Sequence, residues 1–234
     1  MILQPQFVMP AQAASSGLIS NGLTVRYLFD DGSGTTATDL SGNGRDGTIY
    51  GGPTWGSDAD GEYLDTDNVD DYVLLPEATY ISATGYTVFA YLTSPSYVPA
   101  AGAQILSSDR YPTSSKREWQ FRFDLGGKIR VIRFISGSNT QIVSSSSYLS
   151  STIRVGFTFG SAFGTKIYVN GSLDGSSTDT AANVNLSGPP TINCSLNLGS
   201  SSPGYFLGAK YYEARIYNRA FSDSEMIALT TGNG

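Results

Sequence analysis

The sequence contains no histidine, and its single cysteine, Cys194, cannot form a disulfide within the chain. Histidine is the commonest general base in enzymes, and a cysteine nucleophile needs a neighbouring base that activates it. We therefore interpret Cys194 as a small buried apolar residue, and we expect no catalysis that depends on histidine or cysteine.

Charged residues are also scarce, at 15% of the chain, and 20 acidic residues against 14 Lys and Arg give a net charge of −6. Nucleic-acid binding requires clustered basic residues, whereas those of this chain are scattered singly along the predicted strands. The sequence has no run of 18 apolar residues. We therefore expect no nucleic-acid partner and no membrane span.

Runs of helix-forming residues are almost absent, while turn formers, β-branched residues and tyrosine are abundant. This composition is typical of many short strands with tight connections, so the predicted fold class is all-β. A length of 234 residues with 40% hydrophobic residues suits one sizeable sandwich. Strand-like runs occupy residues 23–29, 72–75, 86–91, 119–123, 129–135, 152–159, 166–169, 192–198 and 213–217.

The clearest hairpin joins residues 119–123 to residues 129–135 through a glycine-containing turn. In its first strand Trp119, Phe121 and Phe123 share one face, and the two polar residues between them share the other. This alternation predicts a strand with one face in the core.

One short helix is predicted near the C-terminal end of the sequence. Ser222 and Glu225 have the spacing of a capping box, and apolar residues follow at Met226, Ile227 and Leu229.

Residues 1–20 carry no charge and contain Pro5 and Pro10. They lack the basic region of a signal peptide, so we interpret them as an uncleaved, extended N-terminal arm. Such an arm becomes ordered by lying against something, and another subunit is the obvious candidate. No composition shift follows, and we therefore predict a single domain at residues 21–234.

Three stretches of the chain together carry a family resemblance. They are residues 27–48 leading to 52–55, residues 70–73, and residues 213–225. In this order they resemble laminin-G-like domains of the concanavalin A-like lectin/glucanase superfamily. The resemblance implies a jelly-roll-like sandwich of two antiparallel sheets.

A calcium site is the sharpest chemical hypothesis, and members of the resembled group often hold calcium in this region. Calcium takes about six to eight oxygen ligands, often from an irregular loop. The candidate ligands are Asp39, Asn43, Asp46 and Glu213. The alternative is a turn that bonds to itself, with Glu213 paired to Arg215 or Arg219. A second acidic stretch consists of Asp58, Asp60, Glu62, Asp65, Asp67, Asp70 and Asp71. It does not match an EF-hand loop and is interpreted as a solvated acidic face, with a metal site as the alternative.

Glycan binding is suggested by the lectin-like resemblance and by the 15 tyrosines, whose rings combine an apolar face with a hydroxyl. Tyrosine is also an ordinary core residue of sandwiches, so those in predicted loops are the better candidates. These are Tyr97, Tyr111, Tyr148 and Tyr205.

Glycoside hydrolysis is the main enzymatic alternative and needs two carboxyl groups at a defined separation. No predicted strand carries alternating acidic residues. The residues that share a strand face with Glu118 are Gln120 and Arg122, which are not acidic. We therefore expect a non-catalytic protein.

The favoured function is a structural or adhesion subunit of a larger assembly, such as a head-decoration or fibre protein of a phage, located on the virion surface or outside the cell. Its partners would be other subunits, through the arm, and surface glycans. The alternative is a free carbohydrate-binding lectin module.

Overall fold

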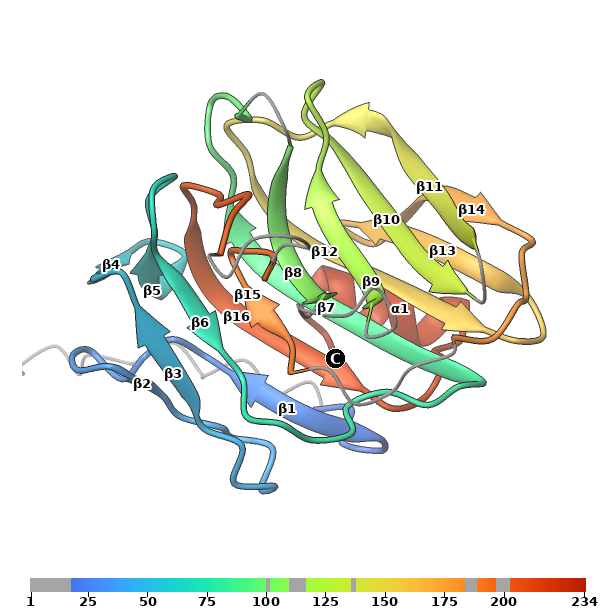
Figure 1. The fold of residues 1–234 in the computed structure, drawn as a ribbon, viewed down its shortest axis with the longest axis horizontal. Helices are drawn as coiled ribbons and strands as arrows, with labels where there is room; N and C mark the ends of the chain where they lie inside the picture. Colours follow the sequence, from blue (N-terminus) through green and yellow to red (C-terminus); the bar gives the residue numbers. More distant parts are fainter. Residues whose placement is uncertain (1–17, 100–101, 110–116, 136–137, 184–188, 197–202) are drawn as a thin grey trace, which may run out of the picture.

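The computed structural model describes residues 18–99, 102–109, 117–135, 138–183, 189–196 and 203–234 (Figure 1). Two antiparallel sheets face each other. The first, here the back sheet, runs in the order β14 (Ser172–Ser177), β13 (Gly164–Val169), β12 (Thr152–Gly160), β7 (Gly85–Thr93), β16 (Lys210–Tyr217), β5 (Gly61–Asp65) and β4 (Thr54–Asp58), and β1 (Leu23–Tyr27) also pairs with β16.

The second, here the front sheet, runs in the order β11 (Ser138–Ser147), β10 (Lys128–Ile135), β9 (Arg117–Phe123), β8 (Ala103–Asp109), β15 (Thr191–Ile192), β6 (Tyr72–Leu74), β3 (Gly47–Tyr50) and β2 (Thr36–Ala37). The predicted all-β sandwich of two antiparallel sheets is confirmed, and its form is consistent with a jelly roll.

The predicted inner face of β9 is confirmed, because Trp119, Phe121 and Phe123 have no exposed surface. Phe157 of the back sheet meets this face with its ring 5.8 Å from that of Trp119 and 5.3 Å from that of Phe121. The sheets are therefore joined by interdigitating aromatic rings, as in sandwiches whose inner faces form the core.

The predicted strand at residues 192–198 is shorter than expected. β15 ends at Ile192, and the next residue, Asn193, has a φ of 72° that no strand can continue through. The side-chain amide of Asn193 instead donates to the carbonyl oxygen of Asp71 at 2.7 Å. Residues 197–198 lie outside the described part.

The predicted C-terminal helix is confirmed as α1 (Asp223–Thr231), with Ser222 as N-cap and both bonds of the capping box to Glu225. It packs on the outer face of the back sheet, where Met226 and Leu229 join a cluster that includes Phe89 and Tyr217. In the described part of the chain no helix is long and apolar enough to cross a membrane.

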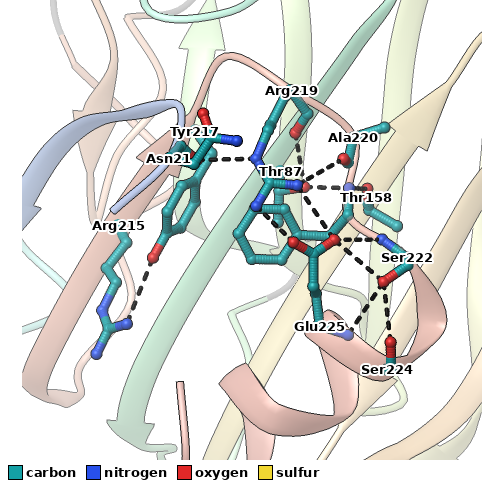
Figure 2. Close-up of polar contacts among 11 residues, drawn as sticks. Asn21, Thr87, Thr158, Arg215, Tyr217, Arg219, Ala220, Ser222, Ser224 and Glu225 are labelled. Atoms are coloured by element: carbon teal, nitrogen blue, oxygen red, sulfur yellow. Dashed lines mark hydrogen bonds and ion pairs between the residues drawn. The ribbon is translucent and has the colours of Figure 1, made fainter. Parts of the chain in front are cut away.

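Figure 2 shows how β16 is joined to α1. The guanidinium of Arg219 donates to both carboxylate oxygens of Glu225, at 3.1 and 2.6 Å, and to the carbonyl oxygen of Asn21 at 2.8 Å. The hydrogen bonds from Arg219 hold the pKa of Glu225 at about 2. The third stretch of the family resemblance therefore serves a structural purpose, because it joins the last strand, the helix and the beginning of the domain.

The charged side chain of Arg133 lies between the two sheets. Arg133 on β10 is 1% exposed, and its guanidinium lies 3.3 Å from the ring centroid of Phe159. Its nitrogens donate to the side-chain oxygen of Asn183 and to the carbonyl oxygens of Asp179 and Ala181. Burial lowers the pKa of Arg133. The segment around residues 179–183 is thereby tied to the front sheet.

Candidate functional site

The turn that carries the predicted calcium ligands is closed by its own hydrogen bonds. The Oδ1 of Asp39 accepts from the backbone N of Arg26 at 3.0 Å and of Ser41 at 2.9 Å. Its Oδ2 accepts from the Ser41 hydroxyl at 2.8 Å and from the Arg45 backbone N at 2.9 Å. Burial opposes ionisation of Asp39, yet these bonds lower its pKa below the usual value.

The other predicted ligands lie around the same turn. Asp46 accepts from the backbone N of Asp39 at 2.9 Å, and Asn43 turns its amide nitrogen, rather than its oxygen, toward the carbonyl of Thr24. Glu213 accepts a hydrogen bond from the side chain of Arg26, and the backbone N of Arg26 donates to Asp39. Contacts through β1 and β16 therefore connect Glu213 to the turn that carries the other three predicted ligands.

Glu213 is an ion-pair partner of two arginines. Its Oε1 accepts from Arg26 Nε at 2.7 Å and from Arg215 Nε at 2.6 Å. The predicted pairing with Arg215 is confirmed, whereas Arg219 binds Glu225 instead. Calcium binding at this turn stays a prediction, and it would have to compete with these protein donors.

The carboxylates of Asp67, Asp70 and Asp71 come closer together than the predicted calcium ligands. Their oxygens lie within 4.8 Å of one another, and the described residues hold no other such group of three. Asp71 is buried, and burial together with the charges of Asp67 and Asp70 raises its pKa. The turn binds itself as well, because Asp67 Oδ1 accepts from the backbone N of Val69 at 2.8 Å.

The predicted glycan-binding tyrosines differ in exposure. Tyr97 is 58% exposed, and its hydroxyl accepts from the Asn68 side chain at 3.2 Å. Tyr148 packs against the core and donates to Asp174 at 2.5 Å, and Tyr205 is half-buried with a φ of 63°. Tyr111 lies outside the described residues. The structure therefore leaves Tyr97 as the most accessible of the three that it describes.

A stacked aromatic pair with one exposed ring was not predicted from the sequence. Tyr50 of β3 and Tyr72 of β6 are cross-strand partners, and their rings stack at 4.8 Å with an interplanar angle of 11°. Tyr50 is 42% exposed, and the ring of Phe206 lies 6.4 Å from that of Tyr72. These tyrosines were not predicted as binding residues because they lie in strands rather than loops. Their alternation with buried neighbours was the signal in the sequence that could have placed them on the outer face.

This pair lies beside the acidic turn. A Cβ at Gly51, the residue after Tyr50, would come within 2.5 Å of the Asp70 carbonyl oxygen. On the other side of the turn, Asn68 accepts from the backbone N of Gly208 at 2.5 Å and also binds Tyr97. We call the aromatic residues around this turn the rim site; they are Tyr50, Tyr72, Tyr97 and Phe206.

Comparison with solved structures finds this sandwich in several binding domains. It superposes with a TM-score of 0.68 on the binding domain of Paraclostridial Mosquitocidal Protein 1, at 15% identity over 90% of this chain and 52% of that chain. For the binding domain of botulinum neurotoxin DC, solved in complex with rat synaptotagmin II, the TM-score is 0.69 at 14% identity over 92% and 52%.

A Trypanosoma rangeli sialidase in complex with sialic acid is also similar, with a TM-score of 0.63 at 14% identity over 90% of this chain and 33% of the sialidase. The chain thus spans about half or less of the length of these proteins, and at such identities the likeness shows the fold alone. No curated protein matched the sequence.

The family model described as the concanavalin A-like lectin/glucanases superfamily matches residues 66–226, which is more than half of the chain. This match covers two of the three stretches on which the resemblance was based, and the fold agrees with it. The chain therefore belongs to the concanavalin A-like lectin/glucanase superfamily.

Proposed function

We propose that this chain is a non-catalytic binding module that holds a glycan at the rim site. The observation that carries the proposal is the stacked pair of Tyr50 and Tyr72, with Tyr50 42% exposed. An aromatic ring stacked on its neighbour and open to solvent presents a rigid apolar surface of the kind that the C–H face of a sugar covers.

Polar groups around the rim site complement the rings. The carboxylates of Asp67 and Asp70 are exposed, and the hydroxyl of Tyr97 lies at the same turn, 3.2 Å from the Asn68 amide. Sugar hydroxyls both donate and accept hydrogen bonds, so carboxylates and a phenol suit them. A few polar groups beside an apolar surface are what fixes the orientation of a ligand.

The glycosidase alternative gains no support from the outer face of β9. Glu118 is 1% exposed, and its Oε2 accepts from the hydroxyl of Ser108. Gln120 and Arg122 occupy the neighbouring positions, where paired carboxyl groups would be required.

We expect Tyr50→Ala to weaken glycan binding about tenfold or more, because it removes the exposed ring of the stacked pair (~1.4 kcal/mol). A glycan array with the whole chain identifies the ligand, and titration calorimetry then compares the variants. Leu125→Ala is the control, since Leu125 is a 63% exposed apolar residue in the turn between β9 and β10 and does not belong to the rim site. An array on which the unaltered chain binds nothing, or equal affinities for Tyr50→Ala and the unaltered chain, would contradict the proposal.

We further propose that the module is a subunit of a larger assembly, such as a head-decoration or fibre protein on a virion surface. This proposal is supported by the 20 uncharged residues at the beginning of the sequence, of which residues 1–17 lie outside the described part. Deletion of residues 1–17 is expected to leave the melting temperature unchanged and to abolish oligomers in light scattering. A chain that is monomeric with and without these residues would instead favour a free lectin module.

A further inference from the structure

The back sheet forks at β16. One edge of β16 pairs with β7, while the other edge is shared between two strands that leave in different directions (Figure 1). β5 pairs with Lys210 and Tyr211, and β1 pairs with residues 214–217. Tyr212 and Glu213 therefore belong to neither ladder, and a gap remains between the two strands at this point.

A β-bulge turns both of these side chains to the same face. The register of β16 against β7 shifts between Tyr211 and Glu213. Tyr211 and Ala214 point into the core, whereas Tyr212 joins the outer cluster and Glu213 binds Arg215 on that side. A bulge re-aims side chains in this way and is frequent beside functional sites.

A cavity of about 380 Å³ lies over the fork, and we call it the fork cavity. The turn between β4 and β5 forms its far wall, because Asp60 accepts from the hydroxyl of Tyr91 at 2.9 Å. The rings of Tyr91 and Tyr212 lie 4.6 Å apart beneath it. The polar and aromatic lining consists of Asp30, Asp60, Glu62, Glu213, Tyr91 and Tyr212.

The carboxylates of the fork cavity are only partly balanced by cations. Glu213 has Arg26 and Arg215, whereas the donors to the Asp60 carboxylate among the described residues are two neutral hydroxyls, those of Tyr91 and Thr152. Within the described part of the chain, no hydrogen-bond or ion-pair partner is found for the side chains of Asp30 and Glu62, which are both exposed.

Among the described residues, two cations lie near the cavity but form no ion pair with Asp30, Asp60 or Glu62. Arg154 lies 3.8 Å from the ring centroid of Tyr91, and Lys210 binds Asp58 at 2.9 Å. Three lining carboxylates, those of Asp30, Asp60 and Glu62, therefore have no ion-pair partner among the described residues. An anionic ligand such as a sialylated sugar would be repelled by them.

A metal ion does not fit the same geometry. Chelation requires several oxygens around one point, and among the described residues only Asp67, Asp70 and Asp71 place three ligand atoms within 4.8 Å of one another. The carboxylates of the fork cavity are spread over its walls instead. A cationic group carried on a carbon chain can contact separated carboxylates and also lie against aromatic rings.

We propose that the fork cavity binds an ammonium or guanidinium group on a flexible alkyl stem, as presented by a basic side chain of a partner protein or by a polyamine. Three carboxylates without an ion-pair partner attract the charged end. Tyr91 and Tyr212 are 7% and 4% exposed, and the stem contacts the small part of their surface that lines the cavity. This site is separate from the rim site, since Glu62 lies near the beginning of β5 (Gly61–Asp65) and Asp67 lies two residues beyond its end; the strand alone carries the chain about 10 Å from Glu62 to Asp65 at 3.3 Å per residue.

The test is a titration of the whole isotope-labelled chain followed by NMR, with spermidine, with N-acetyl-lysine methylamide, and with 1,5-pentanediol as the neutral control. Both amines are expected to shift the backbone resonances of Gly61, Glu62 and Glu213, and the diol is not. Tighter binding of spermidine identifies a polyamine as the ligand, whereas tighter binding of the lysine derivative identifies a protein side chain.

Glu62→Gln combined with Asp30→Asn is expected to raise the Kd of the amines at least tenfold. Both side chains are exposed, so the melting temperature is expected to stay within a few degrees. Asp70→Asn combined with Asp67→Asn removes the same charge at the rim site and is expected to leave the amine Kd unchanged. Equal shifts with the diol, resonance shifts confined to residues 67–71, or an unchanged Kd in the Glu62 and Asp30 variant would overturn the proposal. The Tyr50→Ala variant keeps amine binding, so failure of the glycan proposal is distinguishable.

Discussion

Replacing Arg133 by alanine is expected to lower the free energy of unfolding by about 3–5 kcal/mol. The side chain is 1% exposed, and its stem and guanidinium fill the space against Phe159. Alanine leaves a cavity there and also removes the donors that satisfy the oxygens of Asn183, Asp179 and Ala181. Buried acceptors without donors add their desolvation cost to that of the cavity.

Urea unfolding followed by tryptophan fluorescence measures the loss, with an unchanged m-value showing that the unfolding transition is the same. Arg130→Ala is the matched control on the same strand. Arg130 pairs with Asp124 at 3.4 Å and is more exposed, so its loss is expected to cost less than about 1 kcal/mol. A cost below about 1 kcal/mol for Arg133→Ala would show that the buried guanidinium contributes nothing net to stability.

Gly164→Ala is expected to lower the free energy of unfolding by about 3 kcal/mol, through backbone strain and a steric clash together. Gly164 has a φ of 86°, and a Cβ there would lie 2.0 Å from the carbonyl oxygen of Ser177. Because that oxygen belongs to the neighbouring strand β14, it can move only if the ladder between β13 and β14 is disturbed.

Gly32→Ala separates the two contributions. Gly32 has a φ of 72°, but a Cβ there would meet no atom within 4 Å, so only the strain of about 1 kcal/mol is expected. The difference between the two variants in urea unfolding measures the clash at Gly164. Equal costs would show that β14 moves away freely.

Several features could be predicted because they depend on neighbours in the sequence. The inner face of Trp119, Phe121 and Phe123 follows from the two-residue repeat of a strand. The capping box of Ser222 and Glu225 spans four residues and formed as predicted. The pairing of Glu213 with Arg215 likewise follows from a shared strand face.

The features that matter most for function depend on pairings between distant segments. Tyr50 and Tyr72 stack only because β3 and β6 align them, and Arg26 reaches Glu213 only because β1 lies beside β16. Arg133 is inside because the segment at residues 179–183 supplies oxygens for its donors.

The fold class, the alternation of the strands, the helix cap and the superfamily could thus be predicted from the residues, because these features are local or additive along the chain. Which aromatic rings stay exposed at the rim site, and where the back sheet forks at β16, emerge only in the folded chain. The physical reason is that strand register and the divergence of β1 from β5 are set by packing and hydrogen bonding across the whole sandwich, and no short sequence window contains that information.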